Sequence, residues 1–214
     1  MCLVDIIQDM WKTGGIPQKL GFAVLVIIPK STTDTHFIGL LETLWKVVEA
    51  LIYTRIRVSL QFHDVLHEFQ ARRGTGTAIM ELNLAQELAI VEHDPLFLIF
   101  LDLQKAYNTL YRDRLIQTLE VYSAVPLMCG FLETFWAHQT MVLRHNGNHG
   151  LAFPATQGII QGGLVSPKFF YLVVDNVIRT WLNIIVEYQR VSCDELIEAF
   201  GRCLGVFYAD GGMV

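Results

Sequence analysis

The sequence has little of what several common protein classes require. Its four cysteines are scattered and form no Cys-x-x-Cys pair, so neither a zinc knuckle nor a disulfide framework is indicated and reduced thiols are expected. No apolar run reaches the roughly eighteen residues that a membrane helix needs, because Asp102, Asp175 and Arg179 interrupt the longest candidates. The first residues have neither the basic start nor the apolar core of a secretory signal. We therefore expect an intracellular chain without a membrane partner, in a compartment that the sequence does not identify.

Charge is scarce and negative overall. Charged residues make up 17% of the 214 residues and the formal net charge is −5, whereas a nucleic-acid binder normally carries a positive excess for its phosphate contacts. The basic residues are concentrated in the first third of the chain, so a basic lobe beside an acidic floor is compatible with this balance. Apolar residues reach 52%, and we expect part of this excess to form a surface that further protein covers.

Apolar spacing in the first half predicts alternating helices and strands. Apolar residues from Leu3 to Met10 predict a short helix that ends at Gly14-Gly15 and Pro17, and an apolar, β-branched strand should run from Phe22 to Ile28. Amphipathic helices are expected at 40–58 and 77–91. A basic, glycine-containing loop at 70–77 leads into the second of these, and the N-terminus of a helix is a ready anion site.

The second half predicts a similar mixture. The expected elements are a strand at 96–101, helices through 120 and at 127–138, and a hairpin of strands at 141–144 and 151–153 around Asn146-Gly147-Asn148. Ser166 and Pro167 are typical of the N-cap and first turn of a helix, and the longest helix should run from there to about Glu187. This order predicts an α+β fold in which helices pack behind an antiparallel sheet.

Two strand-like runs each end in an aspartate. Asp102 closes the run that begins at Leu96, and Asp210 closes the run that begins at Leu204. If both strands belong to one sheet, the two carboxylates meet at its edge, where they can hold the hard divalent cations that phosphoryl transfer requires. This pair is the strongest functional signal among the residues themselves.

Three blocks carry a resemblance to one family. Residues 100–107, 157–167 and 207–210 resemble, in order and spacing, the signature blocks of reverse transcriptases from non-LTR retrotransposons and group II introns. Upstream, residues 27–30, 38–41 and 69–77 resemble the finger blocks of the same enzymes, so the similarity covers nearly the whole chain.

The resemblance implies a right-hand polymerase fold with an antiparallel palm sheet. Residues 1–94 would form a fingers-like region and residues 95–214 an incomplete palm-like region, without the thumb. The implied activity is RNA-directed DNA synthesis by two-metal nucleotidyl transfer. The implied partners are an RNA template, a DNA primer, deoxynucleoside triphosphates and a C-terminal thumb segment outside this sequence.

The resemblance also implies roles for matching residues. Asp102 and Asp210 would be catalytic and would hold two Mg²⁺ ions, with Mn²⁺ as the alternative. Tyr107 would pack under the nucleotide sugar and exclude a 2′-hydroxyl, so that deoxynucleotides are preferred. Gln161 and Gly162 would position nucleotide and template, because a glycine lets backbone approach a substrate closely.

Basic residues of the finger blocks are the implied phosphate contacts. Lys30 follows the first predicted strand, and Arg72 and Arg73 lie in the basic loop. Their charge would offset that of the triphosphate or of the template phosphates. Of the three, Lys30 is the stronger candidate.

The sequence departs from the family pattern at three positions. Gly211 stands where the family usually has a second aspartate, which removes a carboxylate from the metal cluster. His36 replaces the usual finger arginine, a permanent cation, by a group that is mostly neutral at pH 7. Asn108 stands where aspartate is frequent. We therefore expect a degenerate or partial reverse transcriptase domain with little or no polymerase activity alone.

Three other interpretations stay open at this stage. His63 and His67 are four residues apart, so on a helix they can share a zinc ion, although the second position of the motif is Asp64 and a third ligand is not evident. The fold can survive as a catalytically dead module that binds nucleic acid or protein. The chain can also be the product of a decayed element.

Overall fold

The computed structural model describes residues 2–29, 35–96, 98, 103–122 and 126–189. Contacts divide the chain into two compact units, one of Met1–Gln61 with Lys105–Leu172 and one of Phe62–Gln104 with Val173–Val214. The predicted division into fingers at 1–94 and palm at 95–214 stays a prediction, because a unit defined by contact density is not a functional subdomain.

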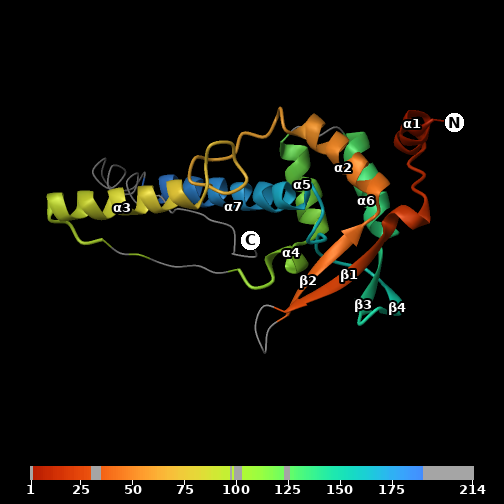
Figure 1. The fold of residues 1–214 in the computed structure, drawn as a ribbon. Helices are drawn as coiled ribbons and strands as arrows, with labels where there is room; N and C mark the ends of the chain where they lie inside the picture. Colours follow the sequence, from red (N-terminus) through yellow and green to blue (C-terminus); the bar gives the residue numbers. More distant parts are fainter. Residues whose placement is uncertain (1, 30–34, 97, 99–102, 123–125, 190–214) are drawn as a thin grey trace. The chain divides into compact units, whose positions relative to one another are not determined.

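The first unit contains a four-stranded sheet in the order β2-β1-β3-β4 (Figure 1). Its strands are β1 (Phe22–Pro29), β2 (Thr35–Leu41), β3 (Thr140–His145) and β4 (Asn148–Pro154). The predicted α+β class, the first strand and the β3–β4 hairpin are confirmed. The outer pairs are antiparallel, but β1 and β3 are parallel, so the prediction of antiparallel pairing is wrong for the central pair. A parallel neighbour requires a long connection, and the 110 residues 30–139 lie between β1 and β3.

Strand β2 includes residues 40 and 41, which the sequence predicts as the start of a helix. The helix predicted at 40–58 begins later, as α2 (Thr43–Ile56), because residues 35–41 pair with β1, with Ile38 opposite Val26. Gly39 lies at a close approach in this strand: a β-carbon there would lie 2.1 Å from the Cγ2 of Ile160. Pairing with β1 therefore overrides the local helical spacing.

Among the described residues, five helices and a 3-10 turn lie wholly within the first unit. They are α1 (Leu3–Thr13), η1 (Gln18–Gly21), α2, α4 (Ala106–Thr109), α5 (Arg112–Val121) and α6 (Pro126–Ala137). Helix α1 ends as predicted, because Gly14 adopts φ 68° and its amide donates to the Met10 carbonyl. Trp45 of α2 stacks on Phe135 of α6, with ring centroids 3.4 Å apart, and both rings are buried. Each such side chain contributes about 1.5–3 kcal/mol through burial.

Helix α7 (Ser166–Gln189) contributes residues to both units and is the longest among the described residues. It begins one residue earlier than expected: the Val165 carbonyl accepts the amide of Phe169, so Val165, not Ser166, is at the N-cap position. Pro167 still lies in the first turn, where its missing N–H costs no hydrogen bond.

The second unit combines α3 (Thr75–Glu92), the preceding segment 62–74 and residues 173–189 of α7. Asp175 of α7 is fully buried and ties two parts of this unit together. Its Oδ1 accepts the His63 amide at 2.5 Å and its Oδ2 accepts the Nε of Arg179 at 2.6 Å. This carboxylate therefore anchors the start of segment 62–74 to α7.

Several predicted features fall on other parts of the chain. The predicted strand leading to Asp102 lies largely outside the described residues, and the one leading to Asp210 lies wholly outside them. Among the helices that the structure describes, none combines the length and the apolar composition needed to cross a membrane.

Candidate functional site

The predicted metal site is not among the described residues. Asp102 and Asp210, the two candidate ligands, lie outside them, as do Lys30 and Gly211. The proximity of the two carboxylates stays a prediction. The structure instead describes the two neighbouring signature blocks, which carry Tyr107, Gln161 and Gly162.

Residues 155–164, here called the glycine strap, connect β4 to α7 and lie against the segment that carries Tyr107. The amide of Ile159 donates to the Tyr107 carbonyl at 2.9 Å, and the amide of Gly158 donates to the Leu110 carbonyl at 3.0 Å. The side chain of Gln157 adds a hydrogen bond to the Thr109 carbonyl at 2.9 Å. The structure therefore brings the Tyr107 block and the Gln161 block together through their backbones.

The other side of the glycine strap contacts strand β2. The amide of Gly39 donates to the Gln161 carbonyl at 2.7 Å. Gly162 has φ 112°, a conformation that L-residues rarely adopt, and a β-carbon on it would lie 2.5 Å from the Gly39 carbonyl oxygen. Glycine at this position is therefore explained by the close approach of β2. The proposed contact of Gly162 with substrate stays a prediction.

Tyr107 is held by the start of α7. It lies in α4, which Lys105 precedes in the left-handed conformation with φ 51°. The Tyr107 ring stacks on Phe170, with centroids 5.1 Å apart and an interplanar angle of 30°. The side chain is half-buried, so one part is fixed by packing and another part stays accessible. This arrangement is compatible with the predicted contact between Tyr107 and a nucleotide sugar.

Arg112 is a residue of this site that the sequence analysis missed. It begins α5 and donates from Nε to the Gly158 carbonyl at 2.8 Å and from Nη1 to the Ala155 carbonyl at 2.6 Å. It also reaches the Trp136 carbonyl at 3.1 Å and the Gln139 Oε1 at 2.6 Å. Burial lowers the pKa of Arg112 to about 10, so it remains charged at neutral pH.

Glu49 is a second missed residue, because it reads as an ordinary polar position of a helix. Its side chain, in α2, is buried, and its Oε2 accepts the Leu164 amide at 2.7 Å, at the end of the glycine strap. Burial raises the pKa of Glu49, and the hydrogen bond from Leu164 opposes this to a smaller degree. Both residues hold backbone that is distant in sequence, so no local pattern marks them.

A cavity of about 330 Å³ lies between the glycine strap and the sheet. The sheet supplies apolar lining residues, namely Leu25, Phe37, Met141, Leu143 and Phe153. Asn108, Gln157 and Gln161 supply amide groups. A Gln161 side chain at such a cavity can make neutral hydrogen bonds, and it is half-buried.

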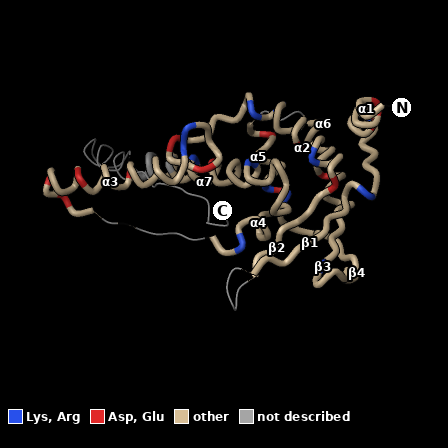
Figure 2. Tube along the Cα trace, viewed as in Figure 1, with Lys and Arg blue, Asp and Glu red and all other residues tan. Residues whose placement is uncertain are grey.

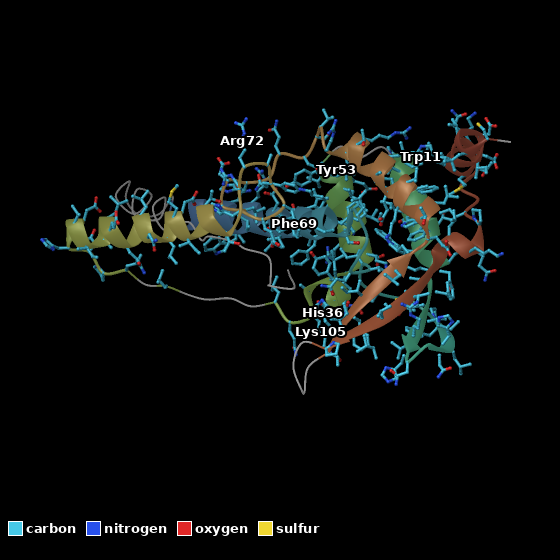
Figure 3. The ribbon with its side chains drawn as sticks, in the orientation of Figure 1. Trp11, His36, Tyr53, Phe69, Arg72 and Lys105 are labelled. Atoms are coloured by element: carbon cyan, nitrogen blue, oxygen red, sulfur yellow. The ribbon has the colours of Figure 1, made fainter. Side chains whose placement is uncertain are left out.

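Arg72 and Arg73, the two phosphate-binding candidates in the basic loop of the second unit, differ in their contacts. Arg73 is paired with Asp64, Nη2 to Oδ1 at 2.8 Å, and also donates to the Asp64 carbonyl. Arg72 is exposed, has no ion pair among the described residues, and its side chain points away from the loop (Figure 3). Arg72 is therefore the more available of the two for a phosphate.

Helix α3 itself offers phosphate little attraction. All its charged side chains are acidic, whereas the loop before it carries Arg72 and Arg73 (Figure 2). Gly74 is the N-cap, and the Thr77 hydroxyl accepts the Gly74 amide at 2.9 Å. The anion site predicted for this helix start consequently depends on the loop arginines and stays a prediction.

The zinc interpretation of His63 and His67 does not fit the structure. Segment 62–70 is not helical, so the assumed spacing of one helical turn is wrong. His67 is fully buried, and its two ring nitrogens contact the Thr77 hydroxyl at 2.9 Å and a Glu81 carboxylate oxygen at 3.1 Å. Within the described ranges, no three His, Cys, Asp or Glu side chains gather in a way that could hold a metal ion.

The sequence profile of the family described as "Reverse transcriptase (RNA-dependent DNA polymerase)" matches residues 28–214. The chain belongs to this family. The match includes the glycine strap, the Tyr107 block and the two predicted metal ligands, and so it confirms the resemblance inferred from the signature blocks. Reverse transcriptases as a family depend on divalent metal and use a nucleic-acid template with nucleotide substrates.

Two relatives place the chain among retroelement proteins. It is 26% identical over 179 residues to the "Transposon TX1 uncharacterized 149 kDa protein" of Xenopus laevis, covering 79% of this chain and 14% of that protein. It is 24% identical over 172 residues to the "Retrovirus-related Pol polyprotein from type-2 retrotransposable element R2DM" of Drosophila melanogaster, covering 78% of this chain and 16% of that protein. These matches confirm the non-LTR retrotransposon affinity; the group II intron type is not confirmed.

The chain spans about one sixth or less of the length of these curated relatives. The activities, substrates and partners of these larger proteins are therefore only proposals for this chain.

Proposed function

We propose that this reverse transcriptase domain performs RNA-directed DNA synthesis by two-metal nucleotidyl transfer, in a weakened form. The observation that carries the proposal is the pairing of the Tyr107 block with the glycine strap through the Ile159 and Gly158 amides. Substrate-positioning residues act best when packing and hydrogen bonds fix them before the substrate binds.

Asp102 and Asp210 are the proposed metal ligands and catalytic residues. Two carboxylates suit Mg²⁺, which prefers oxygen ligands and keeps several positions for water and substrate phosphates. Bound divalent ions would make a primer 3′-hydroxyl more acidic and would offset the charge of the triphosphate. Mn²⁺ accepts the same oxygen donors.

The chain's own residues would then position the nucleotide. Tyr107, supported by Phe170, would lie against the sugar, and Gln161 would hydrogen-bond the nucleotide from the glycine strap. Lys30 and Arg72 would contact phosphates, with Arg73 in a lesser role because of its pair with Asp64. An RNA template and a DNA primer are the proposed partners, together with a thumb segment.

Gly211 is the reason for proposing weakened activity. A cluster with one carboxylate fewer carries less negative charge and aligns the metal less well, and small displacements of reacting groups reduce rates by large factors. We expect slow incorporation that requires Mg²⁺ or Mn²⁺.

A primer-extension assay tests this proposal. Incorporation of deoxynucleotides on an RNA template should depend on divalent metal and disappear in Asp102→Ala and Asp210→Ala. Asp113→Ala, at an exposed aspartate in the first turn of α5, is the matched control and should leave incorporation unchanged. Incorporation that survives both aspartate substitutions would reject the assigned metal ligands.

The second candidate is a catalytically dead module that binds RNA, which Gly211 favours. Thermal unfolding separates the two: a functional metal site should gain thermal stability with Mg²⁺ and lose that gain in Asp210→Ala. A dead module should bind RNA in a salt-sensitive manner without any stabilisation by the metal.

A further inference from the structure

We propose that Arg112 is a positioning residue that holds the glycine strap, and through it Gln161, in the geometry required for nucleotide binding. The proposal deepens the function proposed above and rests on it for its consequence in nucleotide binding. The structural part stands on contacts that belong entirely to the first unit.

Arg112 donates mainly to backbone carbonyls and to no carboxylate among the described residues. Three of its hydrogen bonds go to the carbonyls of Gly158, Ala155 and Trp136, and a fourth goes to the side-chain oxygen of Gln139. Among the described residues it forms no ion pair. A guanidinium shielded from water is normally matched by an acid, so a half-buried arginine that serves neutral acceptors points to a structural role here.

The end of α6 supplies part of the compensation for its charge. Trp136 lies in the last turn of α6, where the carbonyl end of the helix dipole favours a cation. The guanidinium also lies 5.6 Å from the centre of the Trp136 ring, within the range of a cation–π contact. Arg112 thus links the fixed end of a core helix to the glycine strap.

Only arginine fits this set of acceptors. Its planar group presents donors in several fixed directions, and here Nε, Nη1 and Nη2 each reach a different acceptor or pair of acceptors. A lysine would keep the positive charge, but its donors all lie on one atom, so it could not reach the Gly158 and Ala155 carbonyls and the Gln139 side chain in their separate directions.

Loss of these hydrogen bonds should displace Gln161. Arg112 bonds the Gly158 carbonyl and the Tyr107 carbonyl accepts the Ile159 amide, and these two strap residues are three and two positions from Gln161. The Ile159 amide also joins the glycine strap to the Tyr107 block, so a displaced strap should alter this contact as well.

Hydrogen exchange tests the structural part. In Arg112→Lys, the amides of Gly158 and Ile159 should exchange about tenfold faster or more, since each lost bond to a charged donor is a large local change. Arg114→Lys is the matched control: Arg114 lies on the same helix and is exposed, and its guanidinium donates to the side chain of Gln117. It should leave strap exchange unchanged.

Hydrogen exchange of the β1 amides serves as the internal reference in each variant. If Arg112→Lys leaves strap exchange as in the wild type, or accelerates exchange in β1 equally, the positioning role is wrong. Should the lysine variant fail to fold, Gln139→Leu removes one acceptor of Arg112 at similar volume, and it should accelerate exchange in the strap alone. Unchanged exchange in that variant would likewise reject the role.

Nucleotide affinity tests the consequence. With a dideoxy-terminated DNA primer on an RNA template, Arg112→Lys should weaken binding of the matching deoxynucleoside triphosphate about tenfold and leave primer–template affinity unchanged, because one misplaced hydrogen bond corresponds to about that factor. Equal nucleotide affinity in a variant with a loosened strap would refute the consequence. A wild-type chain that binds neither primer–template nor nucleotide would refute the proposed function instead, while the exchange result still decides the role of Arg112.

Discussion

Among the described residues, three ionisable side chains that are buried or half-buried hold backbone segments distant in sequence. Arg112 holds the carbonyls of the glycine strap, Glu49 holds the Leu164 amide, and Asp175 holds the His63 amide. A buried charge is expensive unless hydrogen bonds satisfy it. Each of these residues therefore fixes a backbone segment that is distant in sequence, and its substitution should loosen that segment.

Glu49 should make stability depend on pH. The pKa of Glu49 is raised in the folded chain above its ordinary value of 4.5, so its contribution to stability is fully present below pH 4.5. It is lost as pH rises through the folded pKa, when the buried group must ionise. Glu49→Gln keeps an acceptor for Leu164 and stays neutral, so it should lose less stability than the wild type between pH 4.5 and 7.5.

Urea unfolding at several pH values measures this difference. The free energy of unfolding of the wild type should fall relative to Glu49→Gln as pH rises. Glu120→Gln, at an exposed glutamate of α5, should follow the wild-type pH profile. Parallel profiles for the wild type and Glu49→Gln would show that Glu49 ionises in the folded chain as easily as in the unfolded one.

Asp175→Ala should destabilise the second unit. The substitution leaves the His63 amide without its acceptor, whereas Arg179 is partly exposed and can turn to water. We expect a loss of about 2 kcal/mol in the free energy of unfolding, the cost of one unsatisfied buried donor and one lost charged hydrogen bond. Chemical unfolding of the variant, with Asp113→Ala as an exposed control, gives this value. A loss no larger than in the control would mean that water replaces the carboxylate.

At the scale of elements, the glycine strap depends on its contact with β2. Gly162→Ala adds a β-carbon 2.5 Å from the Gly39 carbonyl oxygen at a residue with φ 112°. A left-handed conformation and a backbone clash together should cost about 2–3 kcal/mol. The melting temperature should fall by several degrees and strap amides should exchange faster.

Gly76→Ala is the matched control for this substitution. Gly76 lies in the first turn of α3, and its β-carbon would meet open space. Alanine there should be neutral or stabilise by up to about 1 kcal/mol, because glycine is a poor helix former. If both variants melt at the wild-type temperature, the close approach of the strap to β2 is not present in solution.

Elements with a local signal could be predicted, and those that depend on partners could not. The end of α1 at Gly14 and the turn between β3 and β4 follow from residues within a few positions of each other. Strand β2 and the parallel pairing of β1 with β3 depend on a partner strand, so the helix predicted at 40–58 is present as α2 but its first residues belong to β2. His67 is similar: its burial against Thr77 and Glu81 is a tertiary contact.

At the scale of the whole molecule, Gly211→Asp should increase activity. The change supplies the second carboxylate that the family pattern has and this chain lacks. We expect at least a tenfold faster Mg²⁺-dependent incorporation in primer extension, since alignment of reacting groups commonly controls factors of this size. Gly212→Asp adds the same charge one position later and should not increase the rate.

A result in which both variants remain inactive would point to a different deficiency. His36 and Asn108 are the other departures from the family pattern, and both lie among the described residues of the first unit. His36 is half-buried in β2 and Asn108 lines the cavity beside Gln161. Their replacement by arginine and aspartate, respectively, in the Gly211→Asp background would be the next comparison.

Exposed apolar side chains agree with the high apolar content of the sequence. Met80, Ile90 and Val91 of α3 are 66%, 72% and 75% exposed, respectively. The expectation that further protein covers such a surface stays a prediction, as does the thumb segment as its source.

The sequence by itself determined the family, the α+β class and the candidate residues, because signature blocks, turn residues and apolar periodicity are patterns of neighbouring positions. Only the tertiary structure decided how the site is supported. Arg112 and Gly158 are 46 positions apart, and Glu49 and Leu164 are 115 apart, so each pair meets only when the sheet and helices have packed. The backbone groups that these side chains hydrogen-bond are buried only in the folded chain. The residues next to Arg112 or Glu49 in the sequence therefore do not reveal this role.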